Sequence, residues 1–419
     1  MVDRNLFLHD LAVVAILKNE GAYLKEWLDY HLLAGVDHFY LYDNDSPDNQ
    51  REVAKPYVEA GLVDYFSAPG KGMQYAVYND AVKRFKFHCR YMAFIDGDEF
   101  IYPKTNQSIA ETVDEVLSHD EHAAGLVINW HTFGSNNYET ADYSCGVLER
   151  FNRRAPNDWA PAGKFNDNDI KLGNAHVKTI ADPRRIKFIN NPHYLNFVDN
   201  FYAVNENIEH VPYWCNFPVT ADKIVINHYY TKSREEYRAK HTRGYAASYA
   251  QDPHYTDKRF EVHDRNEVFD DGILTYRAAR AKNFSLQSDA ERFNLVTAAL
   301  TKTLSAYSSG KIFSMETALT CRALSAYLRE KVPSERWNIY EEASLGALLQ
   351  STSNMSFAEA RLFLRELPKL LKLPYPVVDE LRAATLQIIP QMMKTLRINS
   401  MLEEYVELDY LQDILKLGG

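Results

Sequence analysis

The stretch from Tyr91 to Phe100 constrains this chain more than any other. A short apolar run, Tyr-Met-Ala-Phe-Ile, ends at Asp-Gly-Asp-Glu, which places three carboxylates within four residues. The apolar run has the length and aromatic content of a buried strand. Gly97 lets the backbone turn and lets a ligand approach closely. Because ligands of open α/β sheets bind just beyond the carboxyl ends of the strands, we expect the acidic turn at a binding edge.

The acidic turn also suggests a ligand. Asp96 and Asp98 repel each other unless a cation shares them, and hard oxygen ligands suit Mg²⁺ or Mn²⁺. The alternative is a solvated acidic turn with no ligand. The residues that precede it favour the first interpretation.

Two earlier strands end in polar residues of the same kind. The apolar runs 11–17 and 38–42 read as strands, each followed by a helical stretch, and this alternation predicts parallel strands in a Rossmann-like sheet. Parallel strands present their carboxyl ends at one edge, so we expect the polar ends of these strands to meet there. They are Lys18, Asn19 and Glu20, then Asp43 and Asn44, then Asp96 and Asp98. No GxGxxG follows the first strand, which argues against a dinucleotide site.

Two later segments suit a polar ligand. Residues 130–137 are rich in aromatic and amide groups, which fits a ring-shaped ligand, although an ordinary aromatic corner gives the same pattern. A strand over 224–228 ends at His228 and is followed by Lys232, Lys240 and Arg243. A lone histidine at a strand end is often structural. A cationic cluster beside an acidic metal site is nevertheless what a diphosphate requires.

Length and pattern divide the chain in two. With 419 residues the chain exceeds one typical domain, and the pattern changes from mixed to purely helical near residue 285. We expect an α/β domain over 1–284 and an all-helical domain over 285–419, for acceptor handling or homo-oligomerisation. The helices are predicted at 289–308, 312–331, 337–351, 356–371, 376–396 and 400–416. The last is amphipathic, which fits core packing or, alternatively, contact with a partner or a membrane surface.

Composition excludes several classes of protein. A formal net charge of −10 argues against a nucleic-acid partner. The four cysteines are scattered without CxxC spacing, so neither a zinc site nor a disulfide framework is indicated. No signal peptide and no membrane span is evident. We therefore expect a cytoplasmic protein, with peripheral contact at the inner face of a membrane as a further option.

Several motifs, specific in order and spacing over residues 11–245, resemble those of family-92-type glycosyltransferases and related family-2-like enzymes of the GT-A fold. They are Lys18-Asn19-Glu20, Tyr42-Asp43-Asn44, Ile95-Asp96-Gly97-Asp98-Glu99-Phe100, Trp130–Ser135, Glu149-Arg150-Phe151, Lys178-Thr179-Ile180, Asn227-His228-Tyr229 and Lys232-Ser233. The resemblance implies a GT-A mixed sheet over this region, and the C-terminal helices lie outside it.

The resemblance also implies an activity. It is a metal-dependent, inverting transfer of a sugar from a nucleotide-sugar, such as UDP-galactose or another UDP-hexose, to a glycan or lipid-linked glycan acceptor. Surface-polysaccharide assembly in bacteria is the expected setting. Asp96 and Asp98 would be the family's DxD pair and chelate Mn²⁺ or Mg²⁺ on the diphosphate, and His228 would complete the metal shell.

The remaining roles follow from the same chemistry. Lys232 would pair with the phosphates, and Asn19, Glu20, Asp43 and Asn44 would lie near the base and ribose of the donor. Lys18 and Asp96 would also bind the donor. Inversion needs a carboxylate base near the acceptor hydroxyl, for which Glu149 and Asp158 are both candidates.

Two other functions fit parts of the pattern. Asp-Gly-Asp-Glu also looks like the nucleophile and acid of a haloacid-dehalogenase-like phosphatase, but that pair should end the first strand of its domain. A non-catalytic carbohydrate-binding relative would keep the aromatic residues of the segment 130–137 and lose the acids of the strand ends, all of which are present here.

Overall fold

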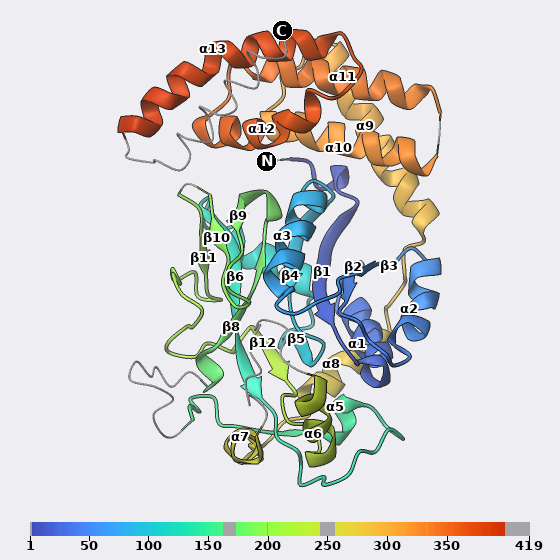
Figure 1. The fold of residues 1–419 in the computed structure, drawn as a ribbon, viewed down its shortest axis with the longest axis vertical. Helices are drawn as coiled ribbons and strands as arrows, with labels where there is room; N and C mark the ends of the chain where they lie inside the picture. The colour runs from blue at the N-terminus through green and yellow to red at the C-terminus, as the bar shows by residue number, and fades with distance from the viewer. Residues whose placement is uncertain (1, 162–172, 199, 244–255, 333, 399–419) are drawn as a thin grey trace. The chain divides into compact units, whose positions relative to one another are not determined.

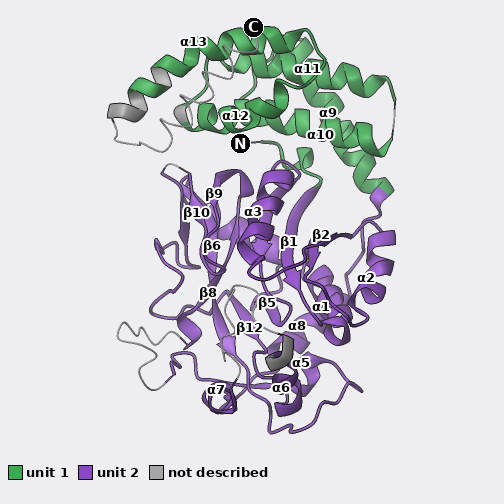
Figure 2. Cartoon of the chain, viewed as in Figure 1, with its two compact units in different colours: residues 1–8, 290–419 green, residues 9–289 purple. Residues whose placement is uncertain are grey.

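The computed structural model describes residues 2–161, 173–198, 200–243, 256–332 and 334–398. The chain divides into two compact units, one of residues 9–289 and one of residues 1–8 together with 290–419 (Figure 2). The predicted division lay at residue 284, and it placed the first eight residues with the α/β domain. Those residues belong instead to the helical unit, because Leu6 and Leu8 pack in its core.

Among the described residues of the unit 9–289, nine strands form one sheet with the order β3-β2-β1-β4-β8-β6-β12-β5, and β11 pairs with β6 (Figure 1). The first four strands in the chain run parallel to one another. They are β1 (His9–Leu17), β2 (His38–Asp43), β3 (Val63–Ser67) and β4 (Cys89–Phe94).

The second half of the sheet is mixed. Strand β8 (Val177–Ala181) is antiparallel to both β4 and β6 (Ala123–Thr132), so β4 and β6 run in the same direction. Strand β12 (Ile224–His228) is parallel to β6 and antiparallel to β5 (Glu99–Pro103). The carboxyl ends of β1, β2, β3, β4, β6 and β12 therefore lie at one edge.

Helices cover both faces of the sheet, which explains the unbroken apolar run of β1. Side chains alternate in direction along a strand. Leu11, Val13, Ala15 and Leu17 accordingly pack in one core cluster with α1 (Gly21–Leu33) and α4 (Ile109–Leu117). Ala12, Val14 and Ile16 pack in another with α3 (Gln74–Phe85).

The remaining elements of this unit surround the sheet. The sequence analysis predicted no helix or strand within residues 253–284, but the described part of that stretch contains α7, β13 and α8, with Phe260, Ile273 and Tyr276 buried. The elements outside the sheet are α2 (Gln50–Glu59), α5 (Val147–Arg150), β7 (Arg153–Arg154), β9 (Ile186–Phe188), β10 (Asn196–Phe197), α6 (Arg234–Arg243), α7 (Asp257–His263), β13 (Val268–Phe269) and α8 (Gly272–Ala281). Strand β11 (Tyr202–Val204) belongs to the sheet itself.

The described residues of the other unit, 1–8 with 290–419, are largely helical, as predicted. Its core gathers Leu300 of α9, Leu324 and Leu328 of α10 and Trp337 of α11. The helices are α9 (Asp289–Ser308), α10 (Met315–Lys331), α11 (Arg336–Ser351), α12 (Phe357–Leu370) and α13 (Val377–Ile398). The helix predicted at 400–416, with its amphipathic face, lies outside the described residues. The predicted fold class, an α/β mixed sheet with a C-terminal all-helical domain, is confirmed.

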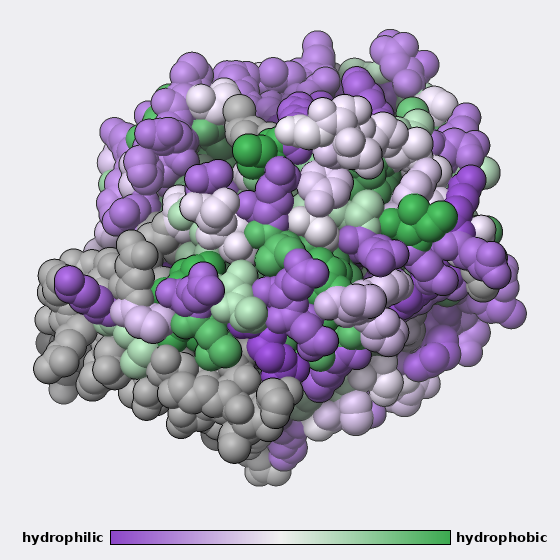
Figure 3. Space-filling model, turned by 90° about the horizontal axis from the view of Figure 1, so that it is seen from above, coloured by the Kyte–Doolittle hydropathy of each residue, from purple (hydrophilic) through white to green (hydrophobic). Residues whose placement is uncertain are grey.

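Where the structure describes the chain, no helix combines the length and the apolar character that crossing a bilayer requires. Figure 3 shows one face of the molecule, on which hydrophobic side chains lie in patches interrupted by hydrophilic ones.

A buried ion pair ties α6 to α5. Arg150 donates two hydrogen bonds of 2.9 Å each to the two carboxylate oxygens of Glu236, and both side chains are 1% exposed. Glu236 also accepts from the Ser233 amide at 3.0 Å and from the Tyr23 hydroxyl at 2.9 Å. Burial alone would raise the pKa of Glu236, but the hydrogen bonds from Arg150 and Ser233 lower it to about 2. Glu236 is therefore ionised, and it fixes the first turn of α6.

Replacing Arg150 by methionine should destabilise the protein by about 3–5 kcal/mol, because the change leaves a buried carboxylate without its cation. Unfolding in urea measures the loss. Lys55→Met is the matched control: Lys55 pairs with Glu59 at 3.7 Å, and the two side chains are 72% and 67% exposed, so this change should cost at most about 1 kcal/mol.

The same pair predicts a pH dependence. Because the folded pKa of Glu236 lies below its usual value of 4.5, the pair stabilises the fold above that pH, and this contribution is lost as the pH falls toward 2. The deficit of Arg150→Met relative to the wild type should therefore shrink on acidification. A deficit that stays constant between pH 7 and pH 3 would contradict the assignment.

Candidate active site

The polar strand ends come together at the carboxyl edge of the sheet. The amide of Asn44 donates to the carbonyl of Leu17 at 2.9 Å, and the amide of Asn19 donates to the hydroxyl of Ser46 at 3.1 Å. A Cβ on Gly97 would lie 3.2 Å from Cγ of Glu20 and 2.9 Å from Cδ2 of Leu17. The turn after β4 therefore packs directly on the turn after β1, and glycine makes that approach feasible.

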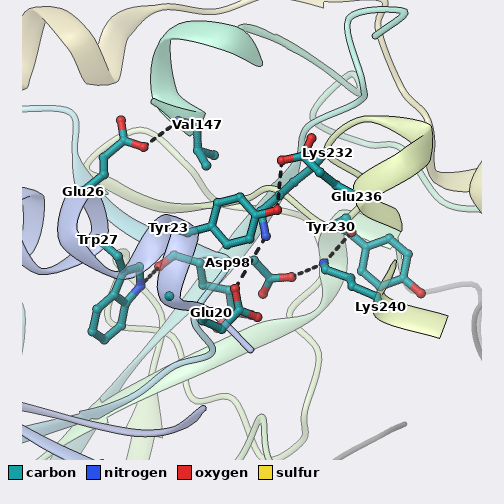
Figure 4. A network of polar contacts seen from close by, with 12 residues as sticks. Glu20, Tyr23, Glu26, Trp27, Asp98, Val147, Tyr230, Lys232, Glu236 and Lys240 are labelled. Carbon is teal, nitrogen blue, oxygen red and sulfur yellow. Dashed lines mark hydrogen bonds and ion pairs between the residues drawn. The ribbon is translucent and has the colours of Figure 1, made fainter. Parts of the chain in front are cut away.

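Asp98 is the buried acid at the centre of this edge (Figure 4). Its Oδ2 lies 2.6 Å from Nζ of Lys240 on α6, and its Oδ1 lies 3.6 Å from Nε2 of His228 at the end of β12. Lys240 also donates to the carbonyl of Tyr230 at 2.7 Å. Burial by itself would raise the pKa of Asp98, but the charge of Lys240 and the contact with His228 hold it well below its usual range. Asp98 is therefore ionised before any ligand binds.

Asp96 makes its contacts with other elements. Its Oδ2 accepts from Nζ of Lys178 on β8 at 2.8 Å, and its Oδ1 accepts from the side-chain amide of Gln74 on α3 at 3.1 Å. Lys178 is 1% exposed and also lies 3.5 Å from Glu99. Burial would lower the pKa of Lys178, but Asp96 and Glu99 raise it above its usual range, whereas burial raises the pKa of Glu99. Lys178 thus forms its hydrogen-bonded ion pair with Asp96, and Glu99 lies farther from the ammonium.

The expected metal site can be compared with this geometry. In the part of the chain that the structure describes, no group of three His, Cys, Asp or Glu side chains is arranged to hold a metal ion. Asp98 and His228 converge as a pair, and the ammonium of Lys240 already places a positive charge on Asp98. Mg²⁺ commonly takes one or two protein ligands and completes its shell with water and substrate phosphates. Asp98 and His228 would therefore supply two protein ligands to a divalent ion, and the diphosphate of a donor would supply others.

Lys232 is buried at the carboxyl edge of the sheet, beside Glu20. Its side chain is 1% exposed, with Nζ 3.8 Å from Oε2 of Glu20 and 3.9 Å from the centre of the Tyr23 ring (Figure 4). Its φ of 51° is in the left-handed region, which few residues other than glycine adopt. Lys18, at the end of β1, is half-buried. The side chain of Arg243, which the sequence assigned to the same cationic cluster, lies outside the described part of the chain.

Asp43 and Asn44 shape the neighbouring loops. Oδ1 of Asp43 accepts from the amide of Ser46 at 2.9 Å, and its Oδ2 lies 3.6 Å from Arg51. The side-chain amide of Asn44 donates to the carbonyls of Ala68 at 2.7 Å and Gly70 at 2.8 Å. These residues hold the loops after β2 and β3 in place beside the acidic turn.

Glu149 and Asp158 are both exposed. Glu149 accepts from Arg277 at 2.8 Å, and Asp158 lies in a turn after β7. The same region holds a partly buried acid to which the sequence analysis assigned no role. Glu26 of α1 accepts from the amide of Val147 at 2.5 Å, and burial raises its pKa (Figure 4).

The segment 130–137, which was expected to be a loop, begins with the last three residues of β6, and its aromatic side chains pack against neighbouring rings and the core. Trp130 stacks on His176 with ring centres 4.7 Å apart and lies 4.3 Å from the ring of His228, and Phe133 is fully buried. Burial lowers the pKa of His176 to about 4, so its ring is neutral near pH 7. This arrangement is the aromatic corner that the sequence left open as the alternative to a sugar-stacking loop.

The sequence analysis also did not predict that Lys178 pairs with Asp96. The signal was present, because a lysine inside the apolar run Val177–Ala181 needs a buried partner. What the sequence could not name was that partner.

Known proteins resemble this chain over the region that contains the candidate active site. The family model described as Glycosyltransferase family 92 matches residues 14–252. A glycosyltransferase family 92 protein of Ricinus communis is 26% identical over 244 residues, which cover 55% of this chain and 37% of that protein. The chain thus spans little more than a third of that relative. A galactan beta-1,4-galactosyltransferase of Arabidopsis thaliana is 31% identical over 100 residues, covering 22% of this chain and 19% of that protein.

A crystal structure of S. aureus TarS aligns over 91% of each chain at 12% identity, with a TM-score of 0.32 that is too low to support an argument. The family model, in contrast, covers more than half of this chain and includes every strand end described above. The protein belongs to glycosyltransferase family 92.

Proposed function

We propose that this glycosyltransferase moves a hexose from a UDP-hexose, such as UDP-galactose, to a glycan or lipid-linked glycan acceptor, with inversion and with Mn²⁺ or Mg²⁺. The observation that supports it is the buried, ionised Asp98 beside His228 at the carboxyl edge of the sheet. The preference for galactose draws on the similarity to the plant galactan beta-1,4-galactosyltransferase.

The charges of the residues at the carboxyl edge of the sheet suit them to different roles. Asp98 and His228 would hold the divalent ion, which when bound neutralises the charge that develops on the departing diphosphate. Lys232 supplies a positive charge close by, and Lys18, Asn19 and Glu20 line the donor side of the turn. Because Asp96 is neutralised by Lys178, its role is to shape the turn that presents Asp98 and to contact the donor.

The acceptor side requires a base. Both Glu149 and Asp158 are exposed and therefore accessible to an acceptor hydroxyl, and we retain both as candidates for the carboxylate that removes its proton. Membership of family 92 favours a transferase over the phosphatase alternative. Loss of catalysis would leave a carbohydrate-binding relative, which the turnover assay below tests.

The biological setting is part of the proposal. From the sequence we infer a cytoplasmic protein that works on surface polysaccharide in bacteria, peripherally at the inner face of the membrane, and that forms homo-oligomers through its C-terminal helices. The organisms of the relatives reported above are plants.

Asp98→Asn should abolish divalent-dependent turnover of UDP-galactose, by at least about 100-fold, because several kcal/mol of charge stabilisation are lost with the carboxylate. Hydrolysis of the donor with and without Mn²⁺ measures the effect, and thermal unfolding verifies the fold. Asp142→Asn, at an exposed site, is the matched control. Full Mn²⁺-dependent activity in Asp98→Asn would remove the metal role.

Lys232→Met should weaken UDP binding by about 1.5–3 kcal/mol, the contribution of a hydrogen bond to a charged group. Calorimetric titration of UDP with Mn²⁺ measures the affinity. Lys25→Met changes a lysine that is 73% exposed on α1 and should leave the affinity unchanged. Equal affinities for wild type and Lys232→Met would show that Lys232 only neutralises Glu20.

A further inference from the structure

Residues 207–218, here called the aromatic loop, present large rings to solvent. Tyr213 is 60% exposed, Trp214 40% and Phe217 57%, and Ile208 in the same segment is 37% exposed. Exposed apolar residues that gather in one segment often mark an interaction site, whereas isolated ones are ordinary. We propose that the aromatic loop is a binding subsite for the neutral sugar units of the acceptor, which rests on the transferase function proposed above.

The backbone of the aromatic loop is fixed to the sheet. The carbonyl of Trp214 accepts from the amide of Val177 at 3.3 Å, and the amide of Asn216 donates to the carbonyl of Ala175 at 2.9 Å. The side chain of Asn216 donates to Oδ1 of Asn129 on β6 at 2.8 Å. The exposed rings are therefore held on a rigid support, which lowers the entropy cost of binding a ligand.

This support lies at the edge that holds the candidate active site. Val177 begins β8 and pairs with Asn129 near the carboxyl end of β6. His176, which precedes it, stacks on Trp130, and Trp130 contacts the ring of His228, the neighbour of Asp98. A continuous series of packed groups thus links the base of the aromatic loop to Asp98.

The chemistry of the aromatic loop favours a neutral sugar. Residues 207–218 contain no lysine or arginine, and the one acid, Glu209, accepts a hydrogen bond from Asn205 at 2.8 Å. Without a fixed cation, the loop is poorly suited to a phosphate or an anionic headgroup. Tyrosine and tryptophan offer an apolar face for the C–H side of a pyranose and one polar group each for its hydroxyls.

The test uses the full chain and three oligosaccharides, β-1,4-galactotetraose, cellotetraose and maltotetraose, titrated in the presence of UDP and Mn²⁺. We expect the wild type to bind at least one of them. The double variant Tyr213→Ala/Trp214→Ala should lower that affinity by about fivefold to tenfold, and Trp214→Phe should retain most of it. Phe269→Ala is the matched control, because Phe269 is also 57% exposed but belongs to strand β13.

The outcomes separate this subsite from the transferase function. Unchanged UDP affinity together with reduced oligosaccharide affinity in the double variant supports the subsite. Wild-type affinity in the double variant, or no binding of any of the three sugars by the wild type, overturns it while UDP binding still stands. Failure of the wild type to bind UDP overturns the proposed function instead. A change in molecular mass by light scattering, without a change in sugar affinity, would identify the loop as a contact between two copies and overturn the subsite.

Discussion

The structure depends on the neutralisation of buried carboxylates where the parallel strands end. Asp98, Glu20 and Glu236 are almost fully enclosed, and each faces a cation from a distant part of the chain. The partners are Lys240, Lys232 and Arg150. An unpaired charge in such a place would cost several kcal/mol, so these pairs decide how the segments after β6 and β12 close over the edge.

This neutralisation has a consequence for ligand binding. The edge is already balanced in charge, since Lys240 faces Asp98 and Lys178 faces Asp96. A divalent ion and a diphosphate bring positive and negative charge together, so a donor bound with its ion adds little net charge to the edge. An ion alone would have to compete with the ammonium of Lys240 for the carboxylate of Asp98. Binding of ion and donor as a unit is the arrangement that this geometry favours.

Much of the α/β unit follows from local pattern. Apolar runs bounded by polar turns predicted β1, β2 and β4 in their order, and helix α9 has the predicted bounds 289–308. Strand β5 was missed because it follows the acidic turn directly and pairs with β12, more than a hundred residues later. Helices α7 and α8 were missed because their segment is rich in charge and turns, and they are stabilised by burying Phe260, Ile273 and Tyr276. Local propensity is a weak guide where tertiary packing decides.

The sequence by itself determined the sheet edge, since parallel strands must present their ends together, and with it the meeting of Lys18, Asn19 and Glu20 with Asp43, Asn44 and the acidic turn. Only the tertiary structure decided that Asp96 and Asp98 contact different elements, one taking Lys178 and the other Lys240 and His228. It also showed exposed rings in the aromatic loop, whereas those of Trp130 and Phe133 pack inward. The physical reason is that the partner of a buried charge or ring is set by distance in space, and neither composition nor spacing along the chain records that distance.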